Sequence, residues 1–368
     1  MMVEIHEITD SEKELLHVLG KFPEISLKEL VNYTKYKRCS SIIKKLTKLK
    51  ENHIIFGPLY HIDFGKLSKN SLCRLHCVVE TDLEFKPVIK YLQIIEPLIL
   101  IYPVLSPYRK VLNVEFLSSN NSKMVEIFQL LKVSNIISDF IIRKSQYKRI
   151  IENPNLYGEF NPSLDHVLAP CEFPDMSCGC HDTIWNTCDI AILPYLMRGY
   201  KETKLIEIAR AEKKVNRIWK YDQIKYSRKK MVECGLIKKE YTVNPFSPVE
   251  CVHFFLFLKC DDILMTERIL YNFARDERVY KEYTLFNEWG LITCFSHPRF
   301  LSDLMNKLDS IDVITEKELY QLRALPPRKY WILRLPELRY YDVDTQRLEY
   351  PYAVYREKIK EKLENEGR

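Results

Sequence analysis

The chain contains the same order of predicted secondary structure twice, and this repetition limits its fold more than any other feature. Residues 11–60 are predicted to form three short helices followed by a strand, and residues 190–243 repeat that order. Each helical unit precedes a run of strand, helix, strand, strand, helix and strand, at about 73–143 and 251–315. With 368 residues the chain can bury several cores. We therefore predict an α+β protein built from two related halves.

The first helical unit carries start signals and a helical periodicity. Ser26 followed by Glu29 has the spacing of a capping box, in which two side chains satisfy free N–H groups at the start of a helix. Within Cys39–Lys50, apolar residues recur on one side of a predicted third helix and lysines on the other. Two short strands of a wing are predicted at Ile54–Phe56 and Tyr60–Ile62, which makes the unit a winged helix-turn-helix.

The second helical unit is a diverged copy of the first. Its helices are predicted at 190–197, 203–211 and 221–234. Gly235 is placed to end the third helix, and Leu236–Ile237 opens a strand where the first unit has Ile54–Ile55. The sequence thus predicts a second winged helix-turn-helix.

The segment after each helical unit has the ferredoxin-like βαββαβ order. The predicted strands are 72–79, 98–104, 111–117 and 136–142 in the first half, and 251–258, 279–286, 291–295 and 309–315 in the second. Intervening helices are predicted at 83–92, 122–131, 263–275 and 299–307. The predicted domains are a winged helix-turn-helix at 1–66, a ferredoxin-like domain at 67–149, a cysteine-containing linker at 150–188, a winged helix-turn-helix at 189–246, a ferredoxin-like domain at 247–316 and a C-terminal extension at 317–368. We expect the two sheets to pack against each other, because each otherwise leaves an apolar face exposed.

Composition excludes several classes of protein. The excess of 56 basic over 50 acidic residues is modest, so only the placement of charge can indicate nucleic acid. No run of 18 uncharged apolar residues occurs, and the acidic N-terminus lacks the regions of a signal peptide. We therefore expect a cytoplasmic protein that does not enter the membrane. Only 9 glycines are present and no Gly-rich phosphate loop.

Basic residues concentrate at the turn and third helix of both helical units. In a helix-turn-helix these parts contact DNA phosphates and enter the major groove. The predicted DNA-binding residues are Lys35, Lys37, Arg38, Ser40, Ser41, Lys44, Lys45 and Lys48 in the first unit, and Arg217, Lys220, Gln223, Lys225, Ser227, Arg228 and Lys229 in the second. The alternative is that each lysine-rich side is simply a solvated helix face. The coincidence of two clusters at the same fold position favours double-stranded DNA as a partner.

The helical motif resembles the winged helix of the Lrp/AsnC family of transcription regulators. The resemblance rests on Ile25–Leu30 and on a basic third helix that ends in Lys-Leu-Lys-Glu-Asn-His-Ile-Ile. His53 stands where the family has a glycine, and Gly235 restores that glycine in the second copy. The resemblance implies that the ferredoxin-like domains serve dimerisation. Two copies in one chain then imply a built-in pseudo-dimer, or a homodimer of such chains. The main hypothesis is a DNA-binding transcription regulator without enzymatic activity.

Two alternatives to this function remain. Siroheme decarboxylases are similar to Lrp/AsnC proteins and handle a tetrapyrrole in the ferredoxin-like domain. The segment Tyr280–Trp289 stands where those enzymes carry a histidine-containing motif, and it contains no histidine. The other alternative is a scaffold whose winged helices bind proteins of the basal transcription machinery.

The linker holds a separate constellation of potential metal ligands. Cys171, Cys178, Cys180 and Cys188 lie within 18 residues, with His181 among them. Such thiolates are ligands for Zn²⁺ or an iron–sulfur cluster, although the spacing is not the two-residue knuckle of common zinc sites. The alternative is a set of free or buried thiols. For residues 317–368 the sequence indicates no role.

Overall fold

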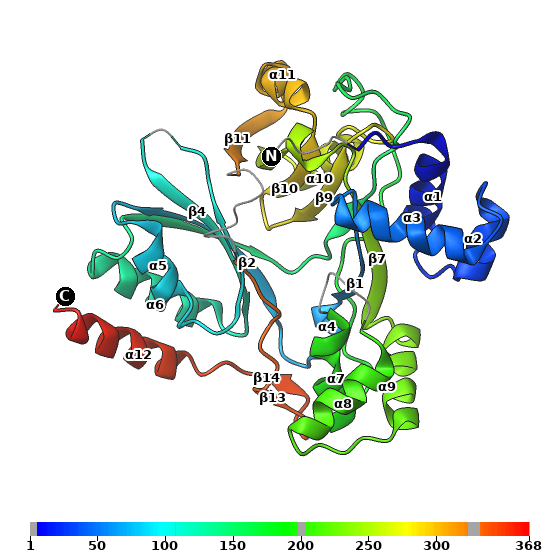
Figure 1. Cartoon of the computed structure of the whole chain (residues 1–368). Coiled ribbons are helices and arrows are strands. Elements are labelled where there is room, and N and C mark those ends of the chain that lie inside the picture. The colour runs from blue at the N-terminus through cyan, green and yellow to red at the C-terminus, as the bar shows by residue number, and fades with distance from the viewer. Residues whose placement is uncertain (1–5, 107, 198–202, 323–331, 368) are drawn as a thin grey trace.

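The computed structural model describes residues 6–106, 108–197, 203–322 and 332–367. Two helical units and two sheets follow the chain in the predicted order (Figure 1). The first unit consists of α1 (Asp10–Lys21), α2 (Leu27–Tyr33) and α3 (Cys39–Glu51). The second consists of α7 (Thr187–Met197), α8 (Leu205–Lys214) and α9 (Tyr221–Glu233). These six helices confirm the predicted ones to within a few residues, and the capping box of Ser26 and Glu29 is present at the start of α2.

The first wing is not the hairpin of two short strands predicted at Ile54–Phe56 and Tyr60–Ile62. Residues Ile55–Ile62 form one strand, β1, which pairs antiparallel with β7 (Ile237–Val243) of the second unit. The register shifts between Phe56 and Leu59, so the Gly-Pro pair makes an irregularity within β1 rather than a hairpin turn. Figure 1 shows β1 and β7 side by side, with α3 and α9 at opposite ends of this ribbon. The two helical units are therefore joined by a shared two-stranded ribbon.

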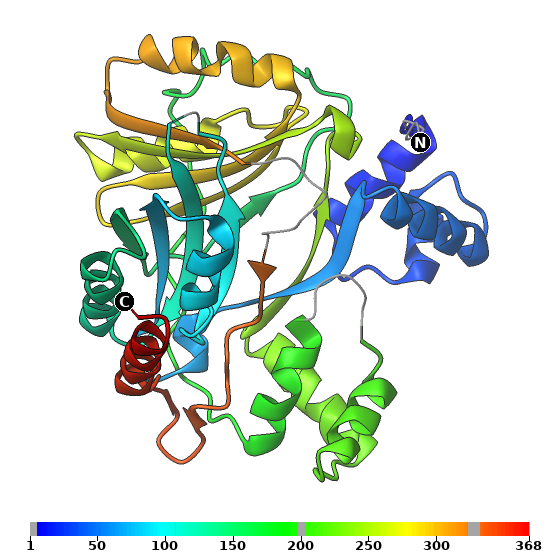
Figure 2. The same ribbon diagram turned by 60° about the vertical axis from the view of Figure 1, so that its left-hand side comes forward.

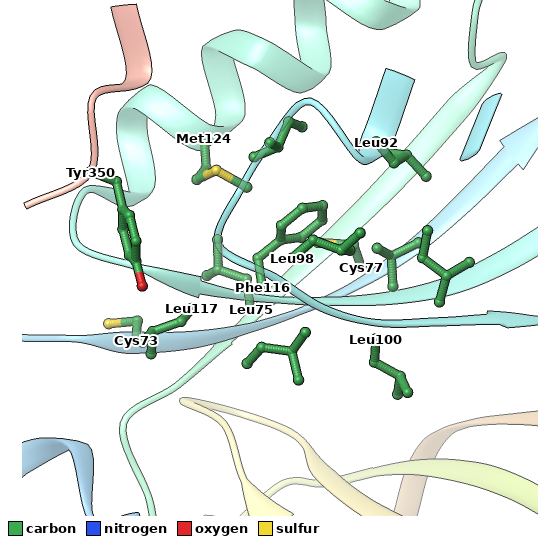
Figure 3. Close-up of a cluster of buried hydrophobic side chains, with 14 of the residues drawn as sticks. Cys73, Leu75, Cys77, Leu92, Leu98, Leu100, Phe116, Leu117, Met124 and Tyr350 are labelled. Atoms are coloured by element: carbon green, nitrogen blue, oxygen red, sulfur yellow. The ribbon is translucent and has the colours of Figure 1, made fainter. Parts of the chain in front are cut away.

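The first sheet has the ferredoxin-like strand order β5-β2-β4-β3. Its elements are β2 (Cys73–Thr81), α5 (Phe85–Leu92), β3 (Leu98–Pro103), β4 (Lys110–Ser118), α6 (Asn121–Val133) and β5 (Asp139–Ser145). Figure 3 shows Leu75, Phe116 and Met124 packed between this sheet and its helices, whereas Leu100 points to the opposite face. One face of the sheet is thus sealed by helices, and the other faces the second sheet.

The second sheet repeats this order as β11-β8-β10-β9. Its elements are β8 (Val252–Cys260), α10 (Ile263–Asn272), β9 (Tyr280–Leu285), β10 (Gly290–Ser296), α11 (Pro298–Asp309) and β11 (Ile314–Gln321). The last strand was predicted at 309–315 and this placement is wrong, because α11 extends to Asp309. Most side chains of β11 are partly or fully exposed, as expected of an edge strand, so it lacks the apolar signal that marks a buried strand.

Segments outside the repeat extend each sheet by one strand. In the linker, β6 (Ile150–Glu152) pairs with β9 of the second sheet, and β12 (Ile332–Leu333) pairs with β3 of the first. The extension continues with β13 (Tyr341–Asp342), β14 (Arg347–Leu348) and α12 (Tyr352–Asn365), which packs on α6 (Figure 2). The short helices α4 (Phe64–Leu67) and η1 (Pro248–Glu250) complete the described elements. Each half therefore supplies an edge strand to the sheet of the other.

The two sheets pack face to face, which confirms the predicted association of the halves. The Arg143 guanidinium lies between the rings of Phe257 and Trp289, 4.5 and 4.4 Å from their centroids. It also pairs with Glu318 at 2.7 Å. On the same interface the His76 ring lies 5.2 Å from that of Phe286. None of the described helices is long and apolar enough to cross a membrane.

Candidate ligand-binding cavity between the sheets

A cavity of about 1320 Å³ lies between the two sheets. It is also lined by the β1–β7 ribbon, by the linker around Ser145–Ile151 and by the extension at Leu333–Pro336. Ligand sites are typically ~300–1,000 Å³, so this cavity suits a ligand larger than most metabolites. Its chemically distinctive lining residues are Tyr60, His61, Arg74, Tyr102, Glu115, Lys148, Arg149, Lys238, Glu240, His253, Phe255, Tyr280, Glu282, Thr293, Phe295 and Arg334.

One part of the lining is a network of charged and polar groups around Arg149. Its Nη1 lies 2.7 Å from Oε2 of Glu282, and its Nη2 lies 3.5 Å from Nδ1 of His61. His61 Nε2 in turn lies 3.2 Å from Oε2 of Glu240. Tyr280 donates its hydroxyl hydrogen to Glu282. The four residues around Arg149 come from β1, β7 and β9, so only the tertiary fold assembles this network.

A second charged group belongs to the first sheet. Arg74 and His76 alternate with buried Leu75 and Cys77 along β2, so they share the face that looks toward the second sheet. Nε of Arg74 lies 3.5 Å from Glu115 on β4, and Nδ1 of His76 lies 3.3 Å from the same carboxylate. Among the described residues, neither terminal nitrogen of Arg74 donates a hydrogen bond to a protein acceptor. That end of the guanidinium is available to a ligand.

Burial sets the protonation states in these networks. Burial, together with nearby Arg149 and Arg74, holds the pKa of His61 well below its usual value, and burial lowers the pKa of His76 to about 4. Both imidazoles are therefore neutral near pH 7. Burial opposes ionisation of Glu115, but the neighbouring cations outweigh it and lower the pKa of that carboxyl. Burial raises the pKa of Glu240, which makes it the carboxyl of the cavity most ready to carry a proton.

A neighbouring part of the cavity wall is aromatic. His253 on β8 stacks on Phe295 with ring centroids 3.9 Å apart, and Tyr102 meets it edge-on at 5.3 Å. Phe255 lies 6.0 Å from Tyr102. Burial lowers the pKa of His253 to about 3, so this ring is neutral and acts as part of an apolar surface. Planar aromatic walls favour a flat ligand, because offset stacking and edge contacts add to area burial.

Sequence reasoning singled out two of these cavity residues, Tyr280 and Glu282, only as part of the segment Tyr280–Trp289, and it assigned none of the others to a site. The strand pattern did carry a signal, since Arg74, His76 and His253 are polar residues within otherwise apolar strands. Such residues on a buried face require partners. The partners lie far away in the sequence, so the pattern alone cannot show that they surround one cavity.

The predicted DNA-binding residues of the first unit form a mostly exposed surface. Lys35, Lys37, Arg38, Ser40, Ser41, Lys44 and Lys48 are exposed. Lys45 differs, because its Nζ lies 3.1 Å from the buried carboxylate of Glu12 on α1. Lys45 therefore has a structural partner inside the unit.

The predicted DNA-binding residues of the second unit differ from one another in exposure and in hydrogen-bond partners. Arg217, Lys220, Gln223, Lys225 and Lys229 are exposed. The Gln223 side chain accepts a hydrogen bond from the backbone N–H of Lys220 at the start of α9. Ser227 is buried, and Arg228 donates to the hydroxyl of Tyr60 at 2.6 Å. The structure thus buries Ser227 and holds the half-buried Arg228 against Tyr60, so these two residues do not belong to the exposed basic surface.

The four linker cysteines are not brought together. Among the described residues, no group of three or more His, Cys, Asp or Glu side chains is arranged to hold a metal ion. Cys178 lies against Gly65, whereas Cys188 is buried in α7 beside Ser227. Burial raises the pKa of Cys178 to about 11 and also raises that of Cys188, so both thiols are protonated near pH 7. Thiolate ligation of Zn²⁺ or an iron–sulfur cluster has no geometric support here.

Comparison with known proteins identifies the fold. No protein-family model matches the sequence, and no curated protein matches it. The structure of the siroheme decarboxylase NirDL in complex with an iron-uroporphyrin III analogue is similar over 96% of this chain and 100% of that chain, with a TM-score of 0.52 and 10% identity. A second structure of siroheme decarboxylase NirDL covers 95% of this chain and 98% of its own, with a TM-score of 0.50 and 10% identity.

A smaller structure is similar to part of the chain. It is a transcriptional regulatory protein of the AsnC family from Pyrococcus furiosus, which covers 38% of this chain and 89% of its own with a TM-score of 0.26 and 18% identity. The full-length matches extend over both helical units and both sheets. The chain therefore has their α+β fold, with two winged-helix units that are each followed by a ferredoxin-like sheet.

Proposed function

We propose that the protein is an enzyme that binds a tetrapyrrole with several carboxylate side chains, of the siroheme class, and removes carboxyl groups from it as carbon dioxide. The observation that carries this proposal is the large inter-sheet cavity with one charged and one aromatic wall. A tetrapyrrole combines a flat apolar ring with anionic side chains, and this cavity offers a matching surface to each part. The full-length likeness to siroheme decarboxylase NirDL supports the same class of ligand.

The charged wall suits carboxylates. Arg74 presents free guanidinium nitrogens, and Lys148, Lys238 and Arg334 add positive charge along the lining. A guanidinium fork matches the two oxygens of a carboxylate, and such charge-assisted hydrogen bonds are about twice as strong as neutral ones. The aromatic wall of Tyr102, His253 and Phe255 suits the ring face or edge.

The reaction requires one proton for each carboxyl group removed. The bond between the side-chain methylene and its carboxylate breaks, carbon dioxide leaves, and the electron pair is delocalised into the macrocycle. A proton then adds to the former methylene carbon, so a methyl group remains and no oxidant or reductant is consumed. Glu240 is our candidate proton donor, because burial raises its pKa and its contact with His61 links it to the Arg149 network. General acids typically contribute ~10²–10⁴-fold to a rate.

Iron uroporphyrin III is the probe for this proposal. Purified protein is titrated with the compound, and binding is followed by the change in its visible absorption. The complex is then incubated without oxygen, and products are resolved by mass spectrometry. We expect saturable binding at one ligand per chain and stepwise loss of the mass of carbon dioxide. Failure to bind this probe and siroheme itself would refute the proposal, and binding without mass loss in either would limit the protein to a carrier.

DNA binding is a second candidate function, favoured by the exposed basic surface of the first helical unit. Lys44 and Lys48 point away from the core on α3, and Lys35, Lys37 and Arg38 are exposed just before or at its start. This is the surface that a helix-turn-helix presents to DNA. The two activities are compatible, since the cavity lies between the sheets and α3 lies outside them (Figure 2).

A further inference from the structure

Glu115 places a buried carboxylate in the wall of the cavity. It lies on β4, is 6% exposed and lines the cavity together with Arg74. A fixed negative charge repels the carboxylates of an anionic ligand, and its burial lowers stability unless it is well paired. Both effects oppose the binding of the proposed ligand, so the contacts of this carboxylate decide what it contributes.

The contacts of Glu115 are long. Its Oε2 is 3.5 Å from Nε of Arg74, and its Oε1 is 3.3 Å from Nδ1 of His76. Charge-assisted hydrogen bonds are shorter, at ~2.7–2.9 Å. By comparison, Oε2 of Glu282, another carboxylate of the cavity wall, lies 2.7 Å from Nη1 of Arg149. The charge of Glu115 is therefore less well balanced than that of Glu282.

Glu115 is nevertheless ionised near neutral pH. Burial raises its pKa, but His76, Arg74 and Arg149 together lower it more, so the pKa of this carboxyl lies below its usual value. Burial also lowers the pKa of His76 to about 4, so this imidazole is a neutral partner. The guanidinium of Arg74 is the charged partner at 3.5 Å.

Arg74 has one positive charge for two carboxylates. Its Nε side faces Glu115, and among the described residues its terminal nitrogens donate to no protein acceptor. A substrate carboxylate bound at those nitrogens shares the guanidinium with Glu115, so the two anions repel each other. Solvent screens such a repulsion much less in a buried site than at an exposed surface.

We propose that Glu115 weakens the binding of a substrate carboxylate to Arg74, and that loss of this carboxylate as carbon dioxide relieves the repulsion. This inference rests on the proposed function and adds a residue that favours turnover over tight binding. Glu115 acts through Arg74, so no contact between Glu115 and the reacting atoms is required. The other carboxylates of the substrate and its ring supply the affinity that the repulsion removes.

The repulsion decreases as the reaction proceeds. The bond between the side-chain methylene and its carboxylate breaks, carbon dioxide leaves, and the electron pair moves into the macrocycle. A proton, for which Glu240 is our candidate donor, then adds to the former methylene carbon. Negative charge thus moves away from Glu115 during bond breaking, so the repulsion is smaller in the transition state than in the bound substrate.

Glu115→Gln tests the inference through the direction of two changes. The amide keeps the shape of the side chain but carries no charge. In an absorption titration we expect iron uroporphyrin III to bind about 10-fold more tightly than to the wild type, and the single-turnover rate of carbon dioxide loss to fall about 10-fold. Glu233→Gln, the same change on the exposed side of α9, should match the wild type in both measurements.

A purely structural role of Glu115 predicts the opposite change in affinity, because a poorly oriented Arg74 binds a carboxylate less well. Weaker or unchanged binding of iron uroporphyrin III by Glu115→Gln, or an undiminished rate, would overturn the inference. Iron octaethylporphyrin lacks carboxylates and should bind the variant and the wild type within about 3-fold. A larger difference with this probe would show that the substitution changes the shape of the cavity, and would also overturn the inference.

A second variant replaces Glu115→Gln if that protein does not fold. His76 and Glu115 are opposite each other on β2 and β4, and Phe255 and Thr293 hold the same positions on β8 and β10 of the second sheet. The double change His76→Phe with Glu115→Thr therefore introduces a pair that this sheet already accommodates. It removes the carboxylate beside Arg74, so the same gain in affinity and loss of rate are expected.

The wild type separates failure of this inference from failure of the proposed function. If it binds neither iron uroporphyrin III nor siroheme, or binds them without loss of carbon dioxide, the proposed decarboxylation fails and this inference fails with it. If the wild type releases carbon dioxide and the variant without the carboxylate shows no gain in affinity, only the role of Glu115 is refuted.

Discussion

Arg149 and Glu282 form an ion pair, with Nη1 and Oε2 2.7 Å apart, on the wall of the inter-sheet cavity. Arg149 directly precedes β6 in the linker, and Glu282 lies on β9, the strand with which β6 pairs. The contact therefore fixes the linker to the second sheet and places a guanidinium beside His61 and Glu115. The carboxylates of Glu282 and Glu115 partly neutralise Arg149, so its guanidinium is held in place without a ligand.

The change Arg149→Met should weaken binding of iron uroporphyrin III. It removes a positive charge from the cavity and leaves Glu282 to repel an anionic ligand. Hydrogen bonds to charged groups contribute ~1.5–3 kcal/mol, so the dissociation constant should rise by roughly 10- to 100-fold in an absorption titration. Arg347→Met on the exposed β14 hairpin is the matched control and should bind like the wild type. Unchanged affinity of Arg149→Met would contradict a role of this cation in binding.

Glu240→Gln should separate binding from turnover. The amide keeps the shape of the side chain and its ability to contact His61, but it cannot deliver a proton. We expect the dissociation constant for iron uroporphyrin III to change by less than about 3-fold and the single-turnover rate of carbon dioxide loss to fall by ~10²-fold or more. Glu233→Gln on the exposed side of α9 should retain the full rate. A rate for Glu240→Gln close to that of the wild type would assign the proton to another group.

His253 should make the protein less stable in mild acid. Its pKa is about 3 in the folded chain and 6.5 when unfolded, so below pH 6.5 the unfolded chain binds a proton that the folded chain does not. Stability should therefore fall as the pH drops below 6.5 and level off near pH 3. Between pH 7.5 and 5.0 this single group costs about 2 kcal/mol of unfolding free energy.

Guanidinium chloride unfolding at both pH values measures the effect. His253→Phe keeps the stack on Phe295 but has no titrating nitrogen. Its loss of unfolding free energy between the two pH values should be smaller than that of the wild type by the same ~2 kcal/mol. An equal loss in both proteins would show that His253 is not buried as a neutral imidazole.

Lys281 should be essential for the stability of the second sheet. Its buried Nζ donates to the carbonyl oxygens of Leu270, Tyr271 and Phe273 at 3.0, 2.8 and 2.9 Å, and it lies 3.1 Å from Glu152. Lys281→Met fills similar space but leaves the carboxylate and three carbonyls without their donor, which should cost ~3–5 kcal/mol. Thermal unfolding should show a large fall in midpoint.

Lys259→Met is the comparison for this change, since its ion pairs with Glu288 and Glu316 are solvent-exposed. Its unfolding midpoint should lie close to that of the wild type, because exposed pairs contribute little. Similar midpoints for the two variants would mean that the carbonyls around Lys281 are satisfied in another way.

The double change Lys44→Ala with Lys48→Ala tests DNA binding separately from stability. If α3 contacts DNA through both lysines, the slope of log affinity against log salt concentration should become shallower by about 2, because two fewer counterions are released. Lys45→Ala should instead lower the unfolding temperature, since it leaves buried Glu12 without this partner. Identical salt slopes for the double variant and the wild type would remove α3 as a DNA-contacting element.

The sequence by itself determined the duplication and the local elements. Helix starts such as Ser26 with Glu29, and the 3.6-residue spacing of apolar residues in α3, are properties of neighbouring residues. The βαββαβ order followed from the same local patterns in both halves. These signals sufficed because the apolar pattern of a helix or a buried strand can be recognised within a window of about ten residues.

Only the tertiary structure decided how the halves join and where the cavity lies. β1 pairs with β7, and β6 and β12 pair with the sheets, so segments far apart in the chain are joined. Backbone hydrogen bonds do not depend on residue type, so the sequence does not show which strands pair. Arg74, Arg149 and His253 likewise come from three distant segments. A polar residue on a buried strand needs a hydrogen-bond or ionic partner, and the sequence shows this need. Which residue becomes the partner is decided by the packing of the assembled fold.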